Sequence, residues 1–248
     1  MKALIALMIS AVAAVAADPR PLLLVLTNHK ELGDTGKPTG FFLSEAAHPF
    51  QVFEAADREV VLASPQGDFA PIDPKSMKLE DAASREFWEK FGNGDPDRPG
   101  VAQTKSLRGL KAEDFDGIFF AGGHGAMWDF PDSDAVQSLT AAIDEQGGVV
   151  GAVCHGPASL VKVKRSNGES LVSGKKVAVF TNAEEKAVEL TQVVPFSLED
   201  ALREAGAEPQ IGENFQENAV LDGRLATGQN PASATRTAEL FLEALRVR

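Results

Sequence analysis

The 248-residue chain has a single cysteine, no tyrosine and four histidines, and its 24 basic residues are outnumbered by 36 acidic ones. One cysteine excludes an intramolecular disulfide and a zinc site built from several thiolates. The net charge of −12 at pH 7 argues against nucleic acid and anionic membranes as partners, because both would repel such a surface. Without tyrosine, proton transfer falls mainly to the cysteine, the histidines and the carboxylates.

The first 17 residues differ from the rest of the chain. A basic start, Met1-Lys2, precedes an almost wholly apolar run at 3–15, and small residues follow before Asp18-Pro19. This pattern is typical of a secretory signal peptide, with an apolar run too short for a comfortable membrane span. Because the apolar run at 22–26 already supplies a first strand, we predict a signal peptide at 1–17. The mature protein would be periplasmic or secreted and free of the membrane, with a cytoplasmic location as the alternative.

Apolar, strand-like runs alternate with helical patterns along the rest of the chain. Strands are expected at 22–26, 59–63, 117–121, 149–153, 175–180, 209–211 and 217–221, and helices at 40–56, 79–91, 132–146, 184–190, 198–205 and 232–245. This alternation predicts one α/β domain over 18–248, with a doubly wound, mostly parallel sheet and helices on both faces. The segment 66–100, rich in Pro, Gly and Asp, is expected to form a cap-like insertion.

The stretch Ala-Val-Cys-His-Gly-Pro-Ala at 152–158 is the centre of the candidate site. A buried strand is expected to end at Cys154, and Gly156-Pro157 to open a helix. Ala152 and Gly156 place small residues two positions on either side of the cysteine, as at a strand-to-helix elbow that holds a nucleophile in a strained conformation. The helix N-terminus would favour the thiolate form. We therefore predict a reactive cysteine, against the bland alternative of a small buried apolar residue.

Two further candidates lie before the cysteine in the sequence. The turn Gly122-Gly123-His124 follows the strand expected at 117–121, and its glycines let backbone N–H groups approach a ligand, as an oxyanion hole requires. Glu45 is an acidic residue in an otherwise apolar helical segment. If it is buried near the thiol, desolvation raises its pKa and makes it a proton carrier. The alternative is a glutamate that faces solvent.

A third candidate lies after the strand expected at 175–180. A carboxylate there would accept a hydrogen bond from His155 and hold its tautomer. Glu184 and Glu185 both follow that strand. We prefer Glu185, although either residue would also suit the first turn of a helix.

Four segments together resemble the ThiJ/PfpI superfamily, which has the fold of the class I glutamine amidotransferases. They are Ala-Val-Cys-His-Gly-Pro-Ala at 152–158, Phe-Phe-Ala-Gly-Gly-His-Gly at 119–125, Glu-Ala-Ala-His-Pro-Phe at 45–50 and Leu-Ala-Thr-Gly-Gln-Asn-Pro-Ala-Ser-Ala at 225–234. Within the superfamily they look like the cofactor-independent glyoxalase III enzymes, also described as heat-shock chaperones and protein deglycases.

The resemblance implies a role for each candidate residue. It makes Cys154 the nucleophile, His155 its neighbour, Glu185 the third member and Glu45 the acid/base that faces the thiol. Gly123 and the backbone of His155 would form the oxyanion hole. It implies no cofactor and no metal.

The leading functional hypothesis is a glyoxalase III-like reaction that converts a small 2-oxoaldehyde such as methylglyoxal, with water, to a 2-hydroxy acid. A cysteine hydrolase or deglycase is the first alternative, because the elbow suits acyl chemistry equally well. A stress holdase or a redox sensor is the second. Glutamine amidotransfer is set aside, since the related amidotransferases use a downstream His-x-Glu pair and His155 is the last histidine of this chain. The oligomeric state stays open, with a homodimer as one option.

Overall fold

The computed structural model describes residues 18–247, so the predicted signal peptide at 1–17 lies outside the described residues and stays a prediction. The strands are β1 (Leu22–Val25), β2 (Val60–Ser64), β3 (Asp68–Pro71), β4 (Gly100–Ser106), β5 (Gly117–Phe120), β6 (Val149–Val153), β7 (Lys176–Val177), β8 (Glu208–Pro209), β9 (Ala219–Asp222) and β10 (Leu225–Gly228). The helices are α1 (Leu43–Ala55), α2 (Ala82–Phe91), α3 (Ala126–Asp129), α4 (Asp134–Glu145), α5 (Asn182–Ala187), α6 (Leu198–Glu204) and α7 (Ala234–Arg246). Among these described helices, none is both long and apolar enough to cross a membrane.

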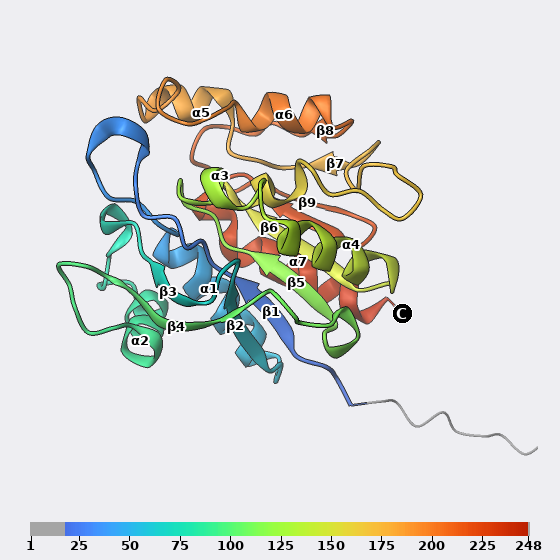
Figure 1. The fold of residues 1–248 in the computed structure, drawn as a ribbon, viewed down its shortest axis with the longest axis horizontal. Coiled ribbons are helices and arrows are strands. Elements are labelled where there is room, and N and C mark those ends of the chain that lie inside the picture. Colours follow the sequence, from blue (N-terminus) through green and yellow to red (C-terminus); the bar gives the residue numbers. More distant parts are fainter. Residues whose placement is uncertain (1–17, 248) are drawn as a thin grey trace, which may run out of the picture.

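One sheet organises the molecule. It has eight strands in the order β3-β4-β2-β1-β5-β6-β10-β9, and helices cover both of its faces (Figure 1). The pairs from β4 to β10 are parallel, and only the outermost strands, β3 and β9, run antiparallel to their neighbours. The predicted doubly wound α/β fold, with a mostly parallel sheet, is confirmed.

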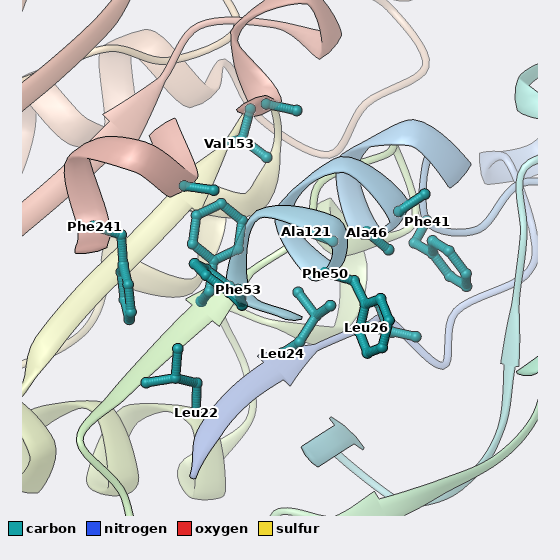
Figure 2. Packing of buried hydrophobic residues seen from close by; sticks show 14 of the residues in the cluster. Leu22, Leu24, Leu26, Phe41, Ala46, Phe50, Phe53, Ala121, Val153 and Phe241 are labelled. Carbon is teal, nitrogen blue, oxygen red and sulfur yellow. The ribbon is translucent and has the colours of Figure 1, made fainter. Parts of the chain in front are cut away.

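The central strand β1 is buried on both faces, as its unbroken apolar sequence predicts. Alternate side chains enter two separate clusters, so that Leu24 packs on one face of the sheet and Val25 on the other. On the first face, Phe53 of α1 contacts Phe119 of β5 and Phe241 of α7, with ring centroids 5.6 and 5.3 Å apart. Figure 2 shows this aromatic packing under α1. The contact fixes α1 on the sheet and therefore fixes where its N-terminal turn lies.

The carboxyl ends of the central strands meet at one edge of the sheet. Phe120 of β5 pairs with Ala152 of β6, and Val153 pairs with Gly228 of β10. The loops after β5, β6 and β10 therefore start side by side. In parallel α/β sheets this edge is where ligands bind, and it is where the sequence places its candidate residues.

The segment 66–100 is built differently from the expected cap. Strand β3 pairs with β4 and extends the main sheet, although β4 itself lies almost wholly beyond the segment. The helix expected at 79–91 is shorter and begins after Asp81, whose carboxylate accepts a hydrogen bond from Ser84 N. The segment still reaches the site, because Asp73 and Lys75 line the cavity over Cys154.

Two further expectations about strands need correction. Strand β10 was not expected, because its four residues include Thr227 and lie directly after the turn that follows β9. It nevertheless lies beside β6 in the sheet, and Thr227 Oγ1 accepts a hydrogen bond from Ala178 N. The strand expected at 175–180 contributes only β7, which pairs with β8 in a separate two-stranded sheet.

Candidate active site

Cys154 occupies a strained elbow directly after β6. Its φ is 61°, a left-handed conformation that is costly for a residue with a Cβ. A Cβ on Gly156 would lie 2.4 Å from the carbonyl oxygen of Phe120, so the small residue predicted there is required by sterics. The strain is held from both sides, because Cys154 N donates to Gly228 O and Cys154 O accepts from Phe180 N. The backbone thus has the elbow geometry that the sequence predicts.

Glu45 lies in the first turn of α1 and is fully buried. Gly122 N donates a 2.9 Å hydrogen bond to its Oε2, and the thiol of Cys154 contacts the same carboxyl group. Oε1 is buried without a hydrogen-bond partner of regular geometry among the described residues. Burial outweighs these contacts and raises the pKa of Glu45 to about 8. This carboxyl therefore keeps its proton at neutral pH.

Burial also raises the pKa of the Cys154 thiol, and Glu45 adds to that effect once it is ionised. The N–H of Gly123, which points at the sulfur, acts in the opposite direction but is weaker. The expected lowering of the thiol pKa by a helix N-terminus is therefore wrong. The turn after Cys154 is a five-residue 3₁₀ helix, Gly156–Leu160, and a helix that short has little dipole to offset the loss of water. In the resting site the sulfur is a thiol beside a carboxylic acid.

His155 connects the sulfur to a second carboxylate. Its Nδ1 lies 3.3 Å from Cys154 Sγ, and its Nε2 lies 2.8 Å from Oε2 of Glu185. Burial, reinforced by the neighbouring His124, lowers the pKa of His155 to about 4, so the ring is neutral at pH 7. Because Glu185 is an acceptor, we assign the ring proton to Nε2, which leaves Nδ1 as the acceptor that faces the thiol.

Glu185 holds two imidazoles. His124 Nε2 lies 3.0 Å from Oε1 of the same carboxylate, and the rings of His124 and His155 are 4.1 Å apart, centroid to centroid. Burial alone would raise the pKa of Glu185, but the hydrogen bonds from both imidazoles outweigh it and lower the pKa to about 2. The carboxylate is therefore charged throughout the physiological range. The predicted choice of Glu185 as the partner of His155 agrees with this geometry.

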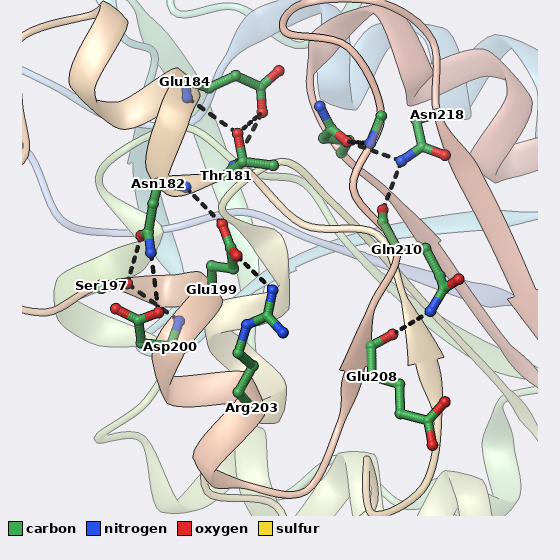
Figure 3. A network of polar contacts seen from close by, with 12 residues as sticks. Thr181, Asn182, Glu184, Ser197, Glu199, Asp200, Arg203, Glu208, Gln210 and Asn218 are labelled. Carbon is green, nitrogen blue, oxygen red and sulfur yellow. Dashed lines mark hydrogen bonds and ion pairs between the residues drawn. The ribbon is translucent and has the colours of Figure 1, made fainter.

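Glu184 has a different place. Thr181 and Glu184 form a capping box at the start of α5: Thr181 Oγ1 accepts from Glu184 N, and Glu184 Oε2 accepts from Thr181 N and Oγ1 (Figure 3). The pattern Thr-x-x-Glu is visible in the sequence and is a recognised capping signal. This pattern would have distinguished the two candidate glutamates, because a side chain that caps the helix is not available to His155.

The turn after β5 supplies backbone donors. Gly123 has a φ of 97°, and its N–H faces the sulfur of Cys154. A Cβ on Gly122 would lie 2.5 Å from Glu45 Oε2 and 2.7 Å from His155 N. The glycine pair therefore lets the backbone pass between the acid and the elbow, which is the close approach that its sequence predicts.

A cavity of about 220 Å³ opens over the sulfur. Cys154, His155, Gly123 and His124 line it near the sulfur. The rest of its lining is largely apolar and includes two charged residues, and it comprises Leu32, Phe42, Asp73, Lys75, Phe180, Val188, Leu190, Phe215 and Pro231. Sequence reasoning missed these walls. They come from widely separated segments of the chain, and no local pattern marks an apolar residue as the wall of a cavity.

Three site residues have the atoms of a metal site. The ligand atoms of His124, His155 and Glu185 lie within 4.8 Å of one another. Each imidazole Nε2 already has the carboxylate as its partner. These two Nε2 atoms and the two carboxylate oxygens of Glu185 therefore have hydrogen-bond partners without a cation. The predicted absence of a metal stays a prediction.

The fold and this constellation define the class of protein. The chain belongs to the DJ-1/PfpI family, whose sequence pattern matches residues 38–244, and the expected family is thereby confirmed. Glyoxalase 3 of Candida albicans is 35% identical over 229 residues, which cover 88% of this chain and 95% of that protein. A glutathione-independent glyoxalase of Saccharomyces cerevisiae is 32% identical over 237 residues, or 92% of this chain and 99% of that protein.

Solved structures give the same relationship. The Rapid Encystment Protein of Francisella tularensis superposes with a TM-score of 0.84 at 38% identity and covers 91% of this chain and 99% of its own. The crystal structure of glyoxalase III from Candida albicans superposes with a TM-score of 0.81 at 32% identity over 91% of this chain and 97% of its own. The similarity thus includes the whole domain rather than the elbow alone.

Proposed function

We propose that the protein is a glutathione-independent glyoxalase, which converts a 2-oxoaldehyde such as methylglyoxal, with water, to a 2-hydroxy acid. The observation that carries the proposal is the Glu45 carboxyl, buried with its proton beside the Cys154 thiol. A hydrogen must move between two adjacent substrate carbons in this reaction, and such a group is the proton carrier that the transfer needs. Relatives named as glyoxalases at 32–35% identity over most of the chain support it.

The first step joins the substrate to Cys154. His155 Nδ1, 3.3 Å from the sulfur, accepts the thiol proton as the sulfur attacks the aldehyde carbon. Glu45 gives its proton to the aldehyde oxygen, and the N–H of Gly123, which faces the sulfur, stabilises the negative charge that develops as the bond forms. The product is a hemithioacetal, with Glu45 as a carboxylate and His155 as an imidazolium that Glu185 stabilises.

The second step moves a hydrogen within the substrate. The Glu45 carboxylate removes the proton of the former aldehyde carbon, whose electron pair forms the double bond of an enediol, while His155 returns its proton to the ketone oxygen. Glu45 then protonates the former ketone carbon and takes the proton of the hydroxyl on the sulfur-bearing carbon, which leaves a thioester. One carbon is oxidised and its neighbour reduced, so the step needs no external oxidant or reductant.

Water completes the reaction. His155 takes a proton from water as its oxygen attacks the thioester carbon, the carbon–sulfur bond breaks, and the proton passes to the sulfur. The 2-hydroxy acid leaves and loses its own proton to solvent. Cys154, His155 and Glu45 are then in their starting protonation states.

The test is lactate formation from methylglyoxal by purified protein without glutathione. We expect turnover by the wild type and its loss in Cys154→Ala, with normal thermal unfolding of the variant as evidence that it folds. Absence of lactate, or turnover that survives Cys154→Ala, would overturn the proposal.

The same purified protein separates the remaining alternatives. Turnover of amide or glycated substrates without turnover of methylglyoxal would replace the glyoxalase with a hydrolase or deglycase. Suppression of client aggregation that survives Cys154→Ala, without any turnover, would indicate a holdase instead.

A further inference from the structure

The cavity over Cys154 is larger and more apolar than methylglyoxal requires. Its volume is about 220 Å³, whereas a three-carbon aldehyde has one methyl group to place against the walls. The remaining apolar surface would stay in contact with water, which is unfavourable. An aromatic or branched aliphatic group on the ketone carbon would cover that surface and expel the water.

Phe215 is the most unusual wall of this cavity. It has a φ of 58°, although it is not a glycine, and 44% of its surface is exposed to solvent. Its ring centroid lies 6.3 Å from that of Phe180, which in turn lies 4.4 Å from the ring of His155. A left-handed backbone is costly for a residue with a Cβ, and it persists where the surrounding structure holds it, often at ligand sites.

A buried polar framework holds Phe215 in this conformation. Its N–H donates a 2.7 Å hydrogen bond to Oε1 of Glu184, which also accepts from Asn230 Nδ2 at 2.9 Å. Asn230 Nδ2 donates as well to the carbonyl oxygen of Gln216. Glu184 and Asn230 have no exposed surface. The acid that caps α5 thus fixes the backbone on which the exposed ring is carried.

A second anchor lies on the other side of the same loop, residues 211–218. The amide of Gln229, also fully buried, accepts from Gly212 N at 2.8 Å and from Asn218 Nδ2 at 2.9 Å. Two consecutive residues of the motif at 225–234, Gln229 and Asn230, therefore anchor this loop. The loop is pre-formed, and its ring is placed before any substrate arrives.

Resting on the glyoxalase function proposed above, we propose that Phe215 determines substrate specificity in this site and selects 2-oxoaldehydes whose ketone carbon carries an aromatic or branched aliphatic group. Glu184 is the positioning residue that holds Phe215 over the cavity. The reactive carbonyl pair lies at the Cys154 thiol, and the apolar group lies against the rings of Phe215 and Phe180, on the side that faces the cavity. The catalytic steps stay those of the small substrate.

The test compares kcat/KM for phenylglyoxal and methylglyoxal. We expect the wild type to prefer phenylglyoxal about tenfold or more in kcat/KM. Phe215→Ala should lower that preference about tenfold, because the loss of one apolar contact has about that effect on discrimination. The change should appear chiefly as a higher KM for phenylglyoxal. Phe215→Gly removes the ring and also suits the positive φ, so it tests the same point if the alanine variant folds poorly. A wild type without preference for phenylglyoxal, or a preference that both variants keep, would overturn the inference.

Two further variants separate positioning from general damage. Glu184→Gln is expected to raise KM for phenylglyoxal more than KM for methylglyoxal, with smaller changes in kcat, because it loosens the loop and leaves the thiol in place. Equal losses on both substrates would overturn the positioning role. Ile211→Ala removes another exposed side chain of the same loop that does not line the cavity, and it should leave both values unchanged. Turnover of neither aldehyde by the wild type would overturn the glyoxalase function itself, and with it this inference.

Discussion

Two carboxyl groups serve the same sulfur, one in direct contact and the other through His155, and their surroundings differ. Glu45 lies in a closed apolar region, receives one backbone N–H at Oε2, and has a pKa raised to about 8 by burial. Glu185 receives two imidazole N–H groups, and its pKa is lowered to about 2. Identical side chains thus serve as a proton carrier and as a fixed charge. The difference teaches that the number of donors facing a buried carboxyl decides its role.

The fold produces this difference by placing the two acids on different supports. Helix α1, fixed by Phe53 against β5 and α7, turns Glu45 into the sheet edge, where few polar groups reach it. The first turn of helix α5 carries Glu185, whose carboxylate bonds to both His124 and His155. The sulfur therefore contacts a neutral acid directly and reaches a charged one through His155.

Removal of the proton carrier should have the largest effect. In Glu45→Gln the amide keeps the size of the side chain but cannot carry a proton, so kcat/KM for a 2-oxoaldehyde should fall about 10³-fold. Steady-state kinetics with Glu54→Gln as a control isolates the effect, because Glu54 lies on the same helix, is exposed and pairs with Lys90 on the surface. A loss below about tenfold would contradict the role given to Glu45.

Removal of the fixed charge should have a smaller effect. Glu185→Gln leaves one acceptor oxygen where His124 and His155 now have one each. The tautomer of His155 with its proton on Nε2 is then less well stabilised, so kcat/KM should fall about 10²-fold. Glu189→Gln, which changes an exposed glutamate just after the same helix, is the matched control. An effect of Glu185→Gln as large as that of Glu45→Gln would break the distinction between the two acids.

The pH dependence of kcat/KM should report the raised pKa. The reaction starts with a protonated Glu45 and a neutral His155, so activity should be flat from above about pH 4 up to about pH 8. It should then fall about tenfold per pH unit as Glu45 ionises. A profile that rises through pH 8 to 9, as for activation of an ordinary thiol, would contradict this.

The two acids should also have opposite effects on stability. The folded state holds the Glu45 proton up to about pH 8, whereas the unfolded chain loses it near 4.5. The free energy of unfolding should therefore fall as pH rises from 4.5 to 8, on the order of a few kcal/mol. Glu185, with its lowered pKa of about 2, stabilises the fold above pH 4.5, and that stability is lost as pH falls toward 2.

Urea unfolding of variants between pH 5 and 8 measures the first effect. Asp129, whose pKa burial raises to about 7, adds a slope of the same sign, so the wild type must be compared with Glu45→Gln, which keeps Asp129. The wild type should lose more stability than the variant over this range. Equal slopes would show that Glu45 is ionised in the folded protein.

The sequence predicts the elbow because its cause is local. The strand that ends at Cys154 and the Gly156-Pro157 pair that follows it are visible within a few positions, and Gly156 has no room for a Cβ. The charge state of the thiol was predicted wrongly because its cause is not local. Helix α1 brings Glu45 to the sulfur from more than a hundred residues away, and the burial that raises both pKa values exists only after the sheet is assembled.

Other parts of the site differ in how much the sequence reveals. The capping pattern from Thr181 to Glu184 was present in the sequence and identifies the acid that cannot serve His155. Phe215 and the walls of the cavity have no comparable signal, because an apolar residue in a loop is common and its place over the thiol depends on Asn230 and its neighbours. Strand β10 also lacks a clear signal in the sequence, because its position beside β6 depends on the topology of the whole sheet.

The most direct test of the account is an infrared titration of the Glu45 carboxyl in the resting protein. The difference spectrum of wild type minus Glu45→Gln isolates the carbonyl band of a protonated carboxylic acid. We predict that this band is present at pH 7 and disappears with a midpoint near pH 8. A band that disappears near pH 4.5 would show a charged Glu45 beside the thiol and would contradict the central claim.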